Sequence, residues 1–190
     1  PNVQVVAAAA LQEAVRRGHG ALVVDTLVSR TLHDTSIPVR EACLRALIQG
    51  DFTNNTEVVQ TMTVLLASSE ASLRRLAVLG LGRAGRIDHA VIAMSDEDVM
   101  VRGAAVHVAC EAPGVAITTE SLGAKDAPRV LSAHSKDLVV EILLRALEDH
   151  DEDLRSVAAT TLCAPELRLG GHSAEIARKI EFELARVQST

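Results

Sequence analysis

Five stretches of the chain repeat one arrangement of apolar and polar positions. Each contains an aliphatic residue that is followed, in four cases of five, by arginine, and we use this pair as the anchor of its stretch. The anchors are Val3-Gln4, Val39-Arg40, Leu73-Arg74, Val101-Arg102 and Leu154-Arg155. Counted from the second member, apolar or small residues return at offsets of minus one, plus three, plus six and plus seven. These offsets trace one face of an α-helix, so the pattern predicts a buried stripe repeated five times.

A second amphipathic stretch precedes each complete anchor, at residues 22–32, 58–66, 87–94 and 138–147. The turns between the two stretches contain acids, serine and threonine, at residues 34–36, 68–70, 96–98 and 149–153. Such side chains accept hydrogen bonds from the free amides at a helix start and suit its positive dipole end. The pattern therefore predicts an all-α fold built from helical pairs.

The interval between Arg102 and Arg155 is the longest between anchors, and it contains an irregular segment at 112–135. Pro113, Gly114, Gly123 and Pro128 interrupt the apolar period there. We expect the segment to form either a long connection with one short helix or a degenerate repeat. It either contributes to recognition, as insertions in solenoids often do, or is a decayed repeat without a function of its own. We treat 1–190 as a single repeat domain. Residues 1–11 match the second half of a repeat, so we expect a piece of a longer array.

Residues 96–105, Asp-Glu-Asp-Val-Met-Val-Arg-Gly-Ala-Ala, and their counterpart at 149–159 resemble the turn and second helix of a HEAT repeat. Bacterial and archaeal HEAT-like proteins, including the subgroup named after phycobilisome bilin lyases, are similar over residues 1–164 apart from the irregular segment. The resemblance implies a right-handed α-solenoid (an α-α superhelix) of about five HEAT-like helical pairs. It also implies a structural ladder of arginines that bond to turn acids of neighbouring units, formed by Arg40, Arg74, Arg102 and Arg155.

Composition narrows the possible partners. Aromatic residues make up 1% of the chain, namely Phe52 and Phe182, so the core is aliphatic and the face lacks a platform for stacking bases. The net charge of −6 argues against general nucleic-acid binding. Three scattered cysteines do not form a secreted disulfide framework, which favours a cytoplasmic protein. Charges interrupt every apolar stretch, so we expect no membrane segment, which needs about 20 apolar residues.

No catalytic or cofactor-binding pattern is evident. No histidine precedes glutamate, as the iron-dependent HEAT-like hydroxylases would require, and no residue supports bilin lyase activity. His107 and Cys110 supply only two metal ligands, and we expect Cys110 and Cys163 to be core residues. The acids at 148–153 lack the glycine and closing glutamate of a calcium loop, which indicates a solvated turn. The glycines at 80, 82 and 85 follow no strand, so we expect them to end a helix. We predict no enzyme activity, cofactor or metal.

The predicted function is that of a protein-protein interaction module or scaffold, which binds another protein along the concave face that the second helices line. Offsets of plus one, plus five and plus nine point away from the buried stripe, and they give the candidate contacts Glu41, Arg45, Arg75, Arg83, His107 and Glu111. Glu41 with Arg45, and His107 with Glu111, are equally explained as local i,i+4 pairs.

The sequence has one basic concentration, formed by Arg74, Arg75, Arg83 and Arg86, which predicts an acidic partner segment. One alternative is an enzyme-associated HEAT-like domain, lyase-like or regulatory, with a pocket near residues 112–135. Another is self-association through the apolar face of an incomplete terminal repeat.

Overall fold

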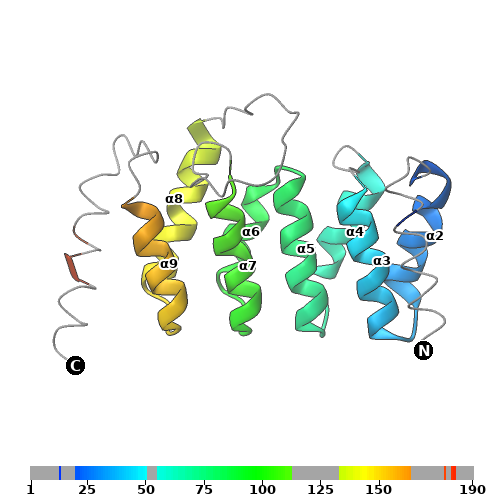
Figure 1. The fold of residues 1–190 in the computed structure, drawn as a ribbon, viewed down its shortest axis with the longest axis horizontal. Coiled ribbons are helices and arrows are strands. Elements are labelled where there is room, and N and C mark those ends of the chain that lie inside the picture. Colours follow the sequence, from blue (N-terminus) through cyan, green and yellow to red (C-terminus); the bar gives the residue numbers. More distant parts are fainter. Residues whose placement is uncertain are drawn as a thin grey trace. The chain divides into compact units, whose positions relative to one another are not determined.

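All regular secondary structure in the described part of the chain is helical in the computed structural model (Figure 1). The structure describes residues 20–50, 55–112 and 133–163, together with Glu13, Arg178 and residues 181–182. In these ranges the helices are α2 (Gly20–His33), α3 (Ile37–Gln49), α4 (Thr56–Leu65), α5 (Ala71–Arg83), α6 (Ile87–Ala93), α7 (Val99–Cys110), α8 (Ala133–Leu147) and α9 (Glu152–Leu162). The prediction of an all-α fold is confirmed, and the predicted first helices coincide with α2, α4, α6 and α8.

Side chains of the preceding turn cap α7 and α9 as predicted, whereas the N-cap residues of α3 and α5, Ser36 and Glu70, make no side-chain cap bond. The Asp98 carboxylate accepts a hydrogen bond from Met100 N at the start of α7, and Asp151 accepts one from Leu154 N at the start of α9. Each bonded cap satisfies an amide that the helix itself leaves unpaired.

The chain divides into two compact units, Pro1–His89 and Ala90–Thr190, and α6 begins in the first and ends in the second. In the first unit α2 packs against α3 and α4 against α5, while α2 also contacts α4 and α3 contacts α5. Helices at equivalent places in successive pairs are therefore neighbours. Six aliphatic side chains of this core are almost completely buried, namely Leu27, Leu44, Leu47, Val58, Leu73 and Leu81.

In the second unit α8 packs against α9, and α7 contacts both. Arg145 on α8 also reaches α6, where its Nη1 donates to the carbonyl of Val91 at 3.3 Å. The predicted stripes of α7 and α9 are buried at Val101, Ala105, Val108, Ala109, Ala158, Thr161 and Leu162. Leu154 is partly exposed, and its Cδ2 lies 3.5 Å from the point that a Cβ on Gly103 would occupy.

The glycine-rich end of α5 has two different roles. Gly85 has a φ of 76°, and Arg86 N donates to Leu81 O while Gly85 N donates to Gly82 O, which is a Schellman C-cap. Gly80 lies inside α5, where an added Cβ would overlap Met62 Sδ and lie 2.9 Å from Ile48 Cγ1. The prediction that these glycines end the helix is correct for Gly85 and wrong for Gly80, which lets α3 and α4 pack closely on α5.

Two predicted segments lie wholly or mainly outside the described residues. They are the first anchor, Val3-Gln4, and most of the irregular segment. At the end of that segment, residues 133–135 form the first turn of α8, so the predicted boundary at 135 was too late. The helix continues to this point because Ala133 to Ser135 contain neither proline nor glycine.

Candidate functional site

The arginine of each described anchor binds backbone carbonyls that precede its own helix, in the turn for Arg74, Arg102 and Arg155 and in the last turn of α2 for Arg40. Its guanidinium reaches back to carbonyl oxygens that no helix amide satisfies, so one cation closes each turn. The bonds are Arg40 Nε to Thr31 O at 2.9 Å; Arg74 Nη1 to Ser68 O and Ser69 O at 2.9 and 3.1 Å; Arg102 Nη1 to Asp96 O and Glu97 O at 3.0 Å each; and Arg155 Nη1 to Asp149 O and His150 O at 2.9 Å each.

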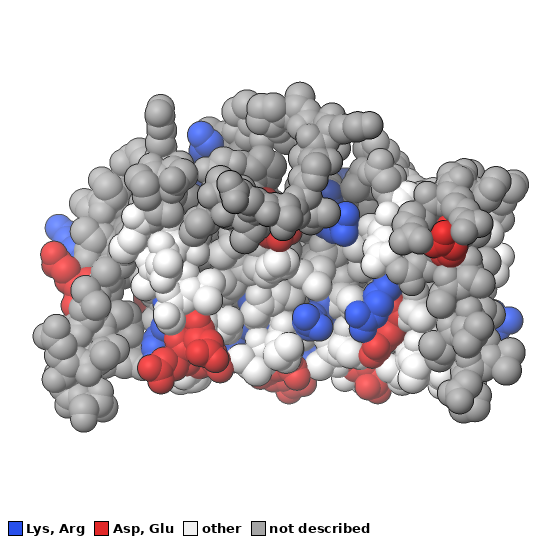
Figure 2. Space-filling view, in the orientation of Figure 1, with Lys and Arg blue, Asp and Glu red and all other residues white. Residues whose placement is uncertain are grey.

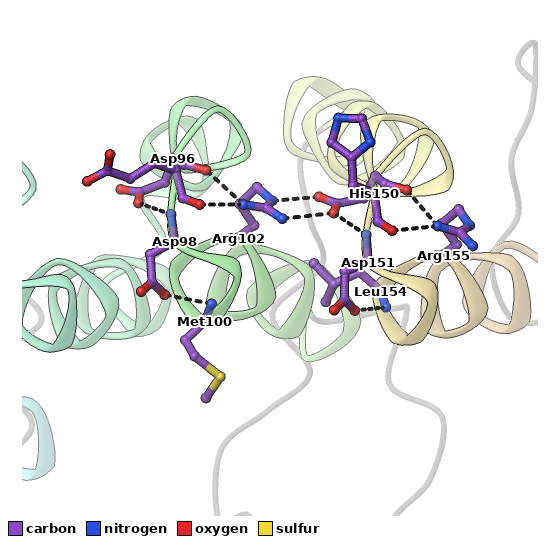
Figure 3. Close-up of polar contacts among 10 residues, drawn as sticks. Asp96, Asp98, Met100, Arg102, His150, Asp151, Leu154 and Arg155 are labelled. Carbon is purple, nitrogen blue, oxygen red and sulfur yellow. Dashed lines mark hydrogen bonds and ion pairs between the residues drawn. The ribbon is translucent and has the colours of Figure 1, made fainter.

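Arg102 also binds an acid of the next helical pair (Figure 3). Its Nε donates to Asp149 Oδ2 at 2.7 Å and its Nη2 to Asp149 Oδ1 at 2.9 Å. The same Asp149 Oδ1 accepts from Asp151 N, just before α9. Arg102 thus joins α7 to an acid in the turn before α9. The bonds described above for Arg40, Arg74 and Arg155 go to backbone carbonyls.

Burial and the fork geometry make the Arg102–Asp149 pair strong. The two side chains are 16% and 5% exposed, so solvent screens their attraction only weakly. The hydrogen bonds from Arg102 hold the pKa of the Asp149 carboxyl below its usual range, against the opposing effect of burial. The same contact raises the pKa of Arg102. Both groups therefore remain charged in the folded protein.

The sequence predicted a solvated turn at 148–153, but the acids of this segment are not all exposed to solvent. Figure 2 shows acidic side chains at the turn end of the α8–α9 pair, and Glu152 and Asp153 are exposed. Asp149 is instead buried in its contact with Arg102. Sequence alone did not distinguish it from its neighbours because the partner stands 47 positions away.

The outward face of α3 and α5 carries four of the predicted contact residues. On α3, Arg45 Nη2 pairs with Glu41 Oε2 at 3.3 Å, in a solvent-exposed i,i+4 bridge. On α5, Arg83 is exposed and Arg75 partly exposed. Figure 2 shows basic side chains over α3 and α5 on this face. We call Arg75, Arg83 and the exposed Arg86 the α5 arginine patch.

Arg74 is not part of that patch, although the sequence grouped it there. Arg74 is 8% exposed, and its guanidinium binds the carbonyls of the turn before α5. Adjacent residues on a helix differ by about 100° in direction, which separates Arg74 from Arg75. Arg74 therefore binds the turn before α5 and is not an exposed contact residue.

The outward face of α7 and α9 carries the other predicted contacts and is less charged. His107 Nε2 lies 3.6 Å from Glu111 Oε1, and both side chains are more than half exposed. Met100 on α7 is 56% exposed and Val157 on α9 is 45% exposed, which the sequence analysis did not anticipate. The positions after the anchor arginines of these two helices are Gly103 and Ser156, where α3 has the charged Glu41 and α5 the charged Arg75.

The three cysteines occupy different environments. Cys43 is buried, and burial raises the pKa of its thiol. Cys110 is half-buried, shares a hydrogen bond of 3.3 Å with Thr161 Oγ1, and also has a pKa raised by burial. Cys163 is exposed at the C-cap of α9, so the expectation that it is a core residue was wrong: the helix ends before its side chain turns inward. Among the residues described, no three His, Cys, Asp or Glu side chains gather as metal ligands.

Comparisons with known proteins do not extend this description. No protein-family model matches the chain, and a search of curated proteins returns no significantly similar sequence. None of the helices in the described ranges is long and apolar enough to cross a membrane. The pocket postulated near residues 112–135 falls mostly outside the described residues.

Proposed function

We propose that this chain is a HEAT-like α-solenoid of about five helical pairs that binds another protein along the outward face of its second helices. The observation that carries the proposal is the division of those helices into two faces. On α3 and α5 one face is buried at Val39, Leu47, Leu73 and Leu81, while the opposite face presents long charged side chains to solvent. Stacked helical pairs use such continuous exposed faces for extended recognition.

Two further features support a binding role rather than a catalytic one. The enclosed polar contacts of Arg74, Arg102 and Arg155 close turns and join helical pairs, which accounts for them structurally. The exposed charges are local pairs or single arginines, a composition suited to contacts at a polar surface. The ladder thus fixes the scaffold and leaves the outward residues available.

The test is capture followed by footprinting. The full-length chain is used to purify bound proteins from the cells that produce it, and the captured complex is labelled with an arginine-specific reagent. We expect protection of Arg45 and Arg75 on the second helices, and unchanged labelling of Arg30 and Arg145 on the first helices, which are both exposed. Protection of Arg30 and Arg145 instead would refute the proposed face. Failure to capture any protein above background would refute the binding role.

A further inference from the structure

Three arginines of the described ranges differ from all others there in lacking an acidic or carbonyl partner. Arg30, Arg45 and Arg145 pair with acids four residues away. Arg40, Arg74, Arg102 and Arg155 bind turn carbonyls. The residues of the α5 arginine patch have neither contact, and no acid stands three or four positions from Arg75 or Arg83.

Helix stability does not explain the patch. Arg83 lies in the last turn of α5 and Arg86 just beyond it, where positive charge suits the helix dipole by about 0.3–1 kcal/mol. Arg75, however, is the fifth residue of the helix that begins at Ala71, where the dipole gives a cation no advantage. A chain with 25 acids and a net charge of −6 nevertheless leaves these cations unpaired on α5 and just after it. This arrangement is typical of a surface that receives an anionic partner.

Building on the proposed function, we propose that the α5 arginine patch binds an extended, acidic peptide segment of the partner protein. Arg75 and Arg83 stand eight positions apart on one helix, which corresponds to about 12 Å along its axis. An extended peptide rises about 3.3 Å per residue, so acids three or four positions apart match the spacing of the two arginines along the helix axis. Arg86, beyond the helix end, is available to a third acid.

A peptide fits this surface better than a nucleic acid. The aromatic residues of the chain are Phe52 and Phe182 alone, so the patch lacks the rings on which single-stranded bases stack. The protein's overall negative charge opposes a polyanion of high charge density.

The experiment measures binding of a fluorescein-labelled peptide with glutamate at every third or fourth position to the full chain by fluorescence anisotropy. The matched peptide has glutamine at those positions. We expect binding of the acidic peptide only, weakening as salt screens the contact. The double variant Arg75→Glu, Arg83→Glu should lose at least about tenfold in affinity. Lys136→Glu, at an exposed position on α8, makes a reversal of the same kind and should leave the affinity unchanged.

Several outcomes would overturn the inference while leaving the proposed function intact. These are equal binding of both peptides, unchanged affinity in the double variant, or tighter binding of an oligothymidylate of equal charge than of the acidic peptide. The milder variant Arg75→Gln, Arg83→Gln covers the case in which charge reversal disturbs folding, with circular dichroism as the check. If a captured native partner binds the double variant normally, the protein-binding module stands and the acidic segment does not.

Discussion

Replacing Arg102 with methionine would remove the cation of a largely buried ion pair while keeping the apolar part of the side chain. Asp149, whose side chain is 5% exposed, would then hold a buried carboxylate without a counter-charge. The carbonyls of Asp96 and Glu97 would lose their donor as well. Breaking one side of such a pair costs about 3–5 kcal/mol. We expect about 3 kcal/mol, at the lower end because the Arg102 side chain retains 16% exposure to water.

The assay is chemical unfolding followed by circular dichroism, because the chain has no tryptophan for fluorescence. Arg40→Met is the matched control: Arg40 holds the same ladder position, donates to Thr31 O, and has no ion pair among the described residues. Its loss should cost about 1–2 kcal/mol. Hydrogen exchange should show weakened protection in α8 and α9 of Arg102→Met, and unchanged protection in α2 and α3.

A double-mutant cycle with Asp149→Asn separates the pair from its surroundings. Asparagine can still accept from Asp151 N but no longer leaves a buried charge when Arg102 is absent. We expect the double variant to be more stable than Arg102→Met alone, with a coupling free energy of about 1–3 kcal/mol. Additive effects, or a loss in Arg102→Met no larger than in Arg40→Met, would refute the reasoning.

Four smaller perturbations test other parts of the structure. Arg102 lowers the pKa of Asp149 in the folded protein, so the pair stabilises the protein fully above the unfolded pKa of about 3.9, and this contribution is lost as the pH falls through the folded pKa. The difference in unfolding free energy between the native chain and Arg102→Met should therefore shrink during acid titration. A constant difference would contradict this prediction. Gly80→Ala should gain about 1 kcal/mol from helix propensity but lose more through overlap with Met62, for a net destabilisation of about 1–3 kcal/mol. The double variant with Met62→Ala should remove that overlap. Thermal unfolding of both variants measures the difference. Gly85→Ala meets no atom within 4 Å, so its cost of about 1–2 kcal/mol should come from the positive φ alone and be smaller for Gly85→Asn. Maleimide labelling read by mass spectrometry should modify Cys163 first and the buried Cys43 last; equal rates would exclude the assigned burial.

Much of the local structure followed from periodicity. Offsets around each anchor predicted which side chains of α3, α5, α7 and α9 are buried, since a helix repeats its direction every 3.6 residues or so and one face must pack. Turn acids predicted the helix starts, because the unpaired amides there need acceptors. Both signals lie within about ten residues of the feature they predict.

Features that depend on distant residues were not predictable in the same way. The burial of Asp149 depends on Arg102, across an interval whose length follows no period. Gly80 looked like a helix end because the propensity of glycine is local, whereas its role is set by Met62 and Ile48 on two other helices. Arg74 and Arg75 look alike in sequence, and only the turn before α5 distinguishes the structural arginine from the exposed one.

The contact between Arg102 and Asp149 also bears on how such a chain can change during evolution. The two side chains, 47 positions apart in the sequence, align α9 with α7 directly, so the register of the helices does not depend on the length of the chain between them. Neither partner of this contact lies in the interval between α7 and α8. We therefore expect a variant with residues added in that interval to keep the Arg102–Asp149 pair, and with it the expected contribution of about 3 kcal/mol.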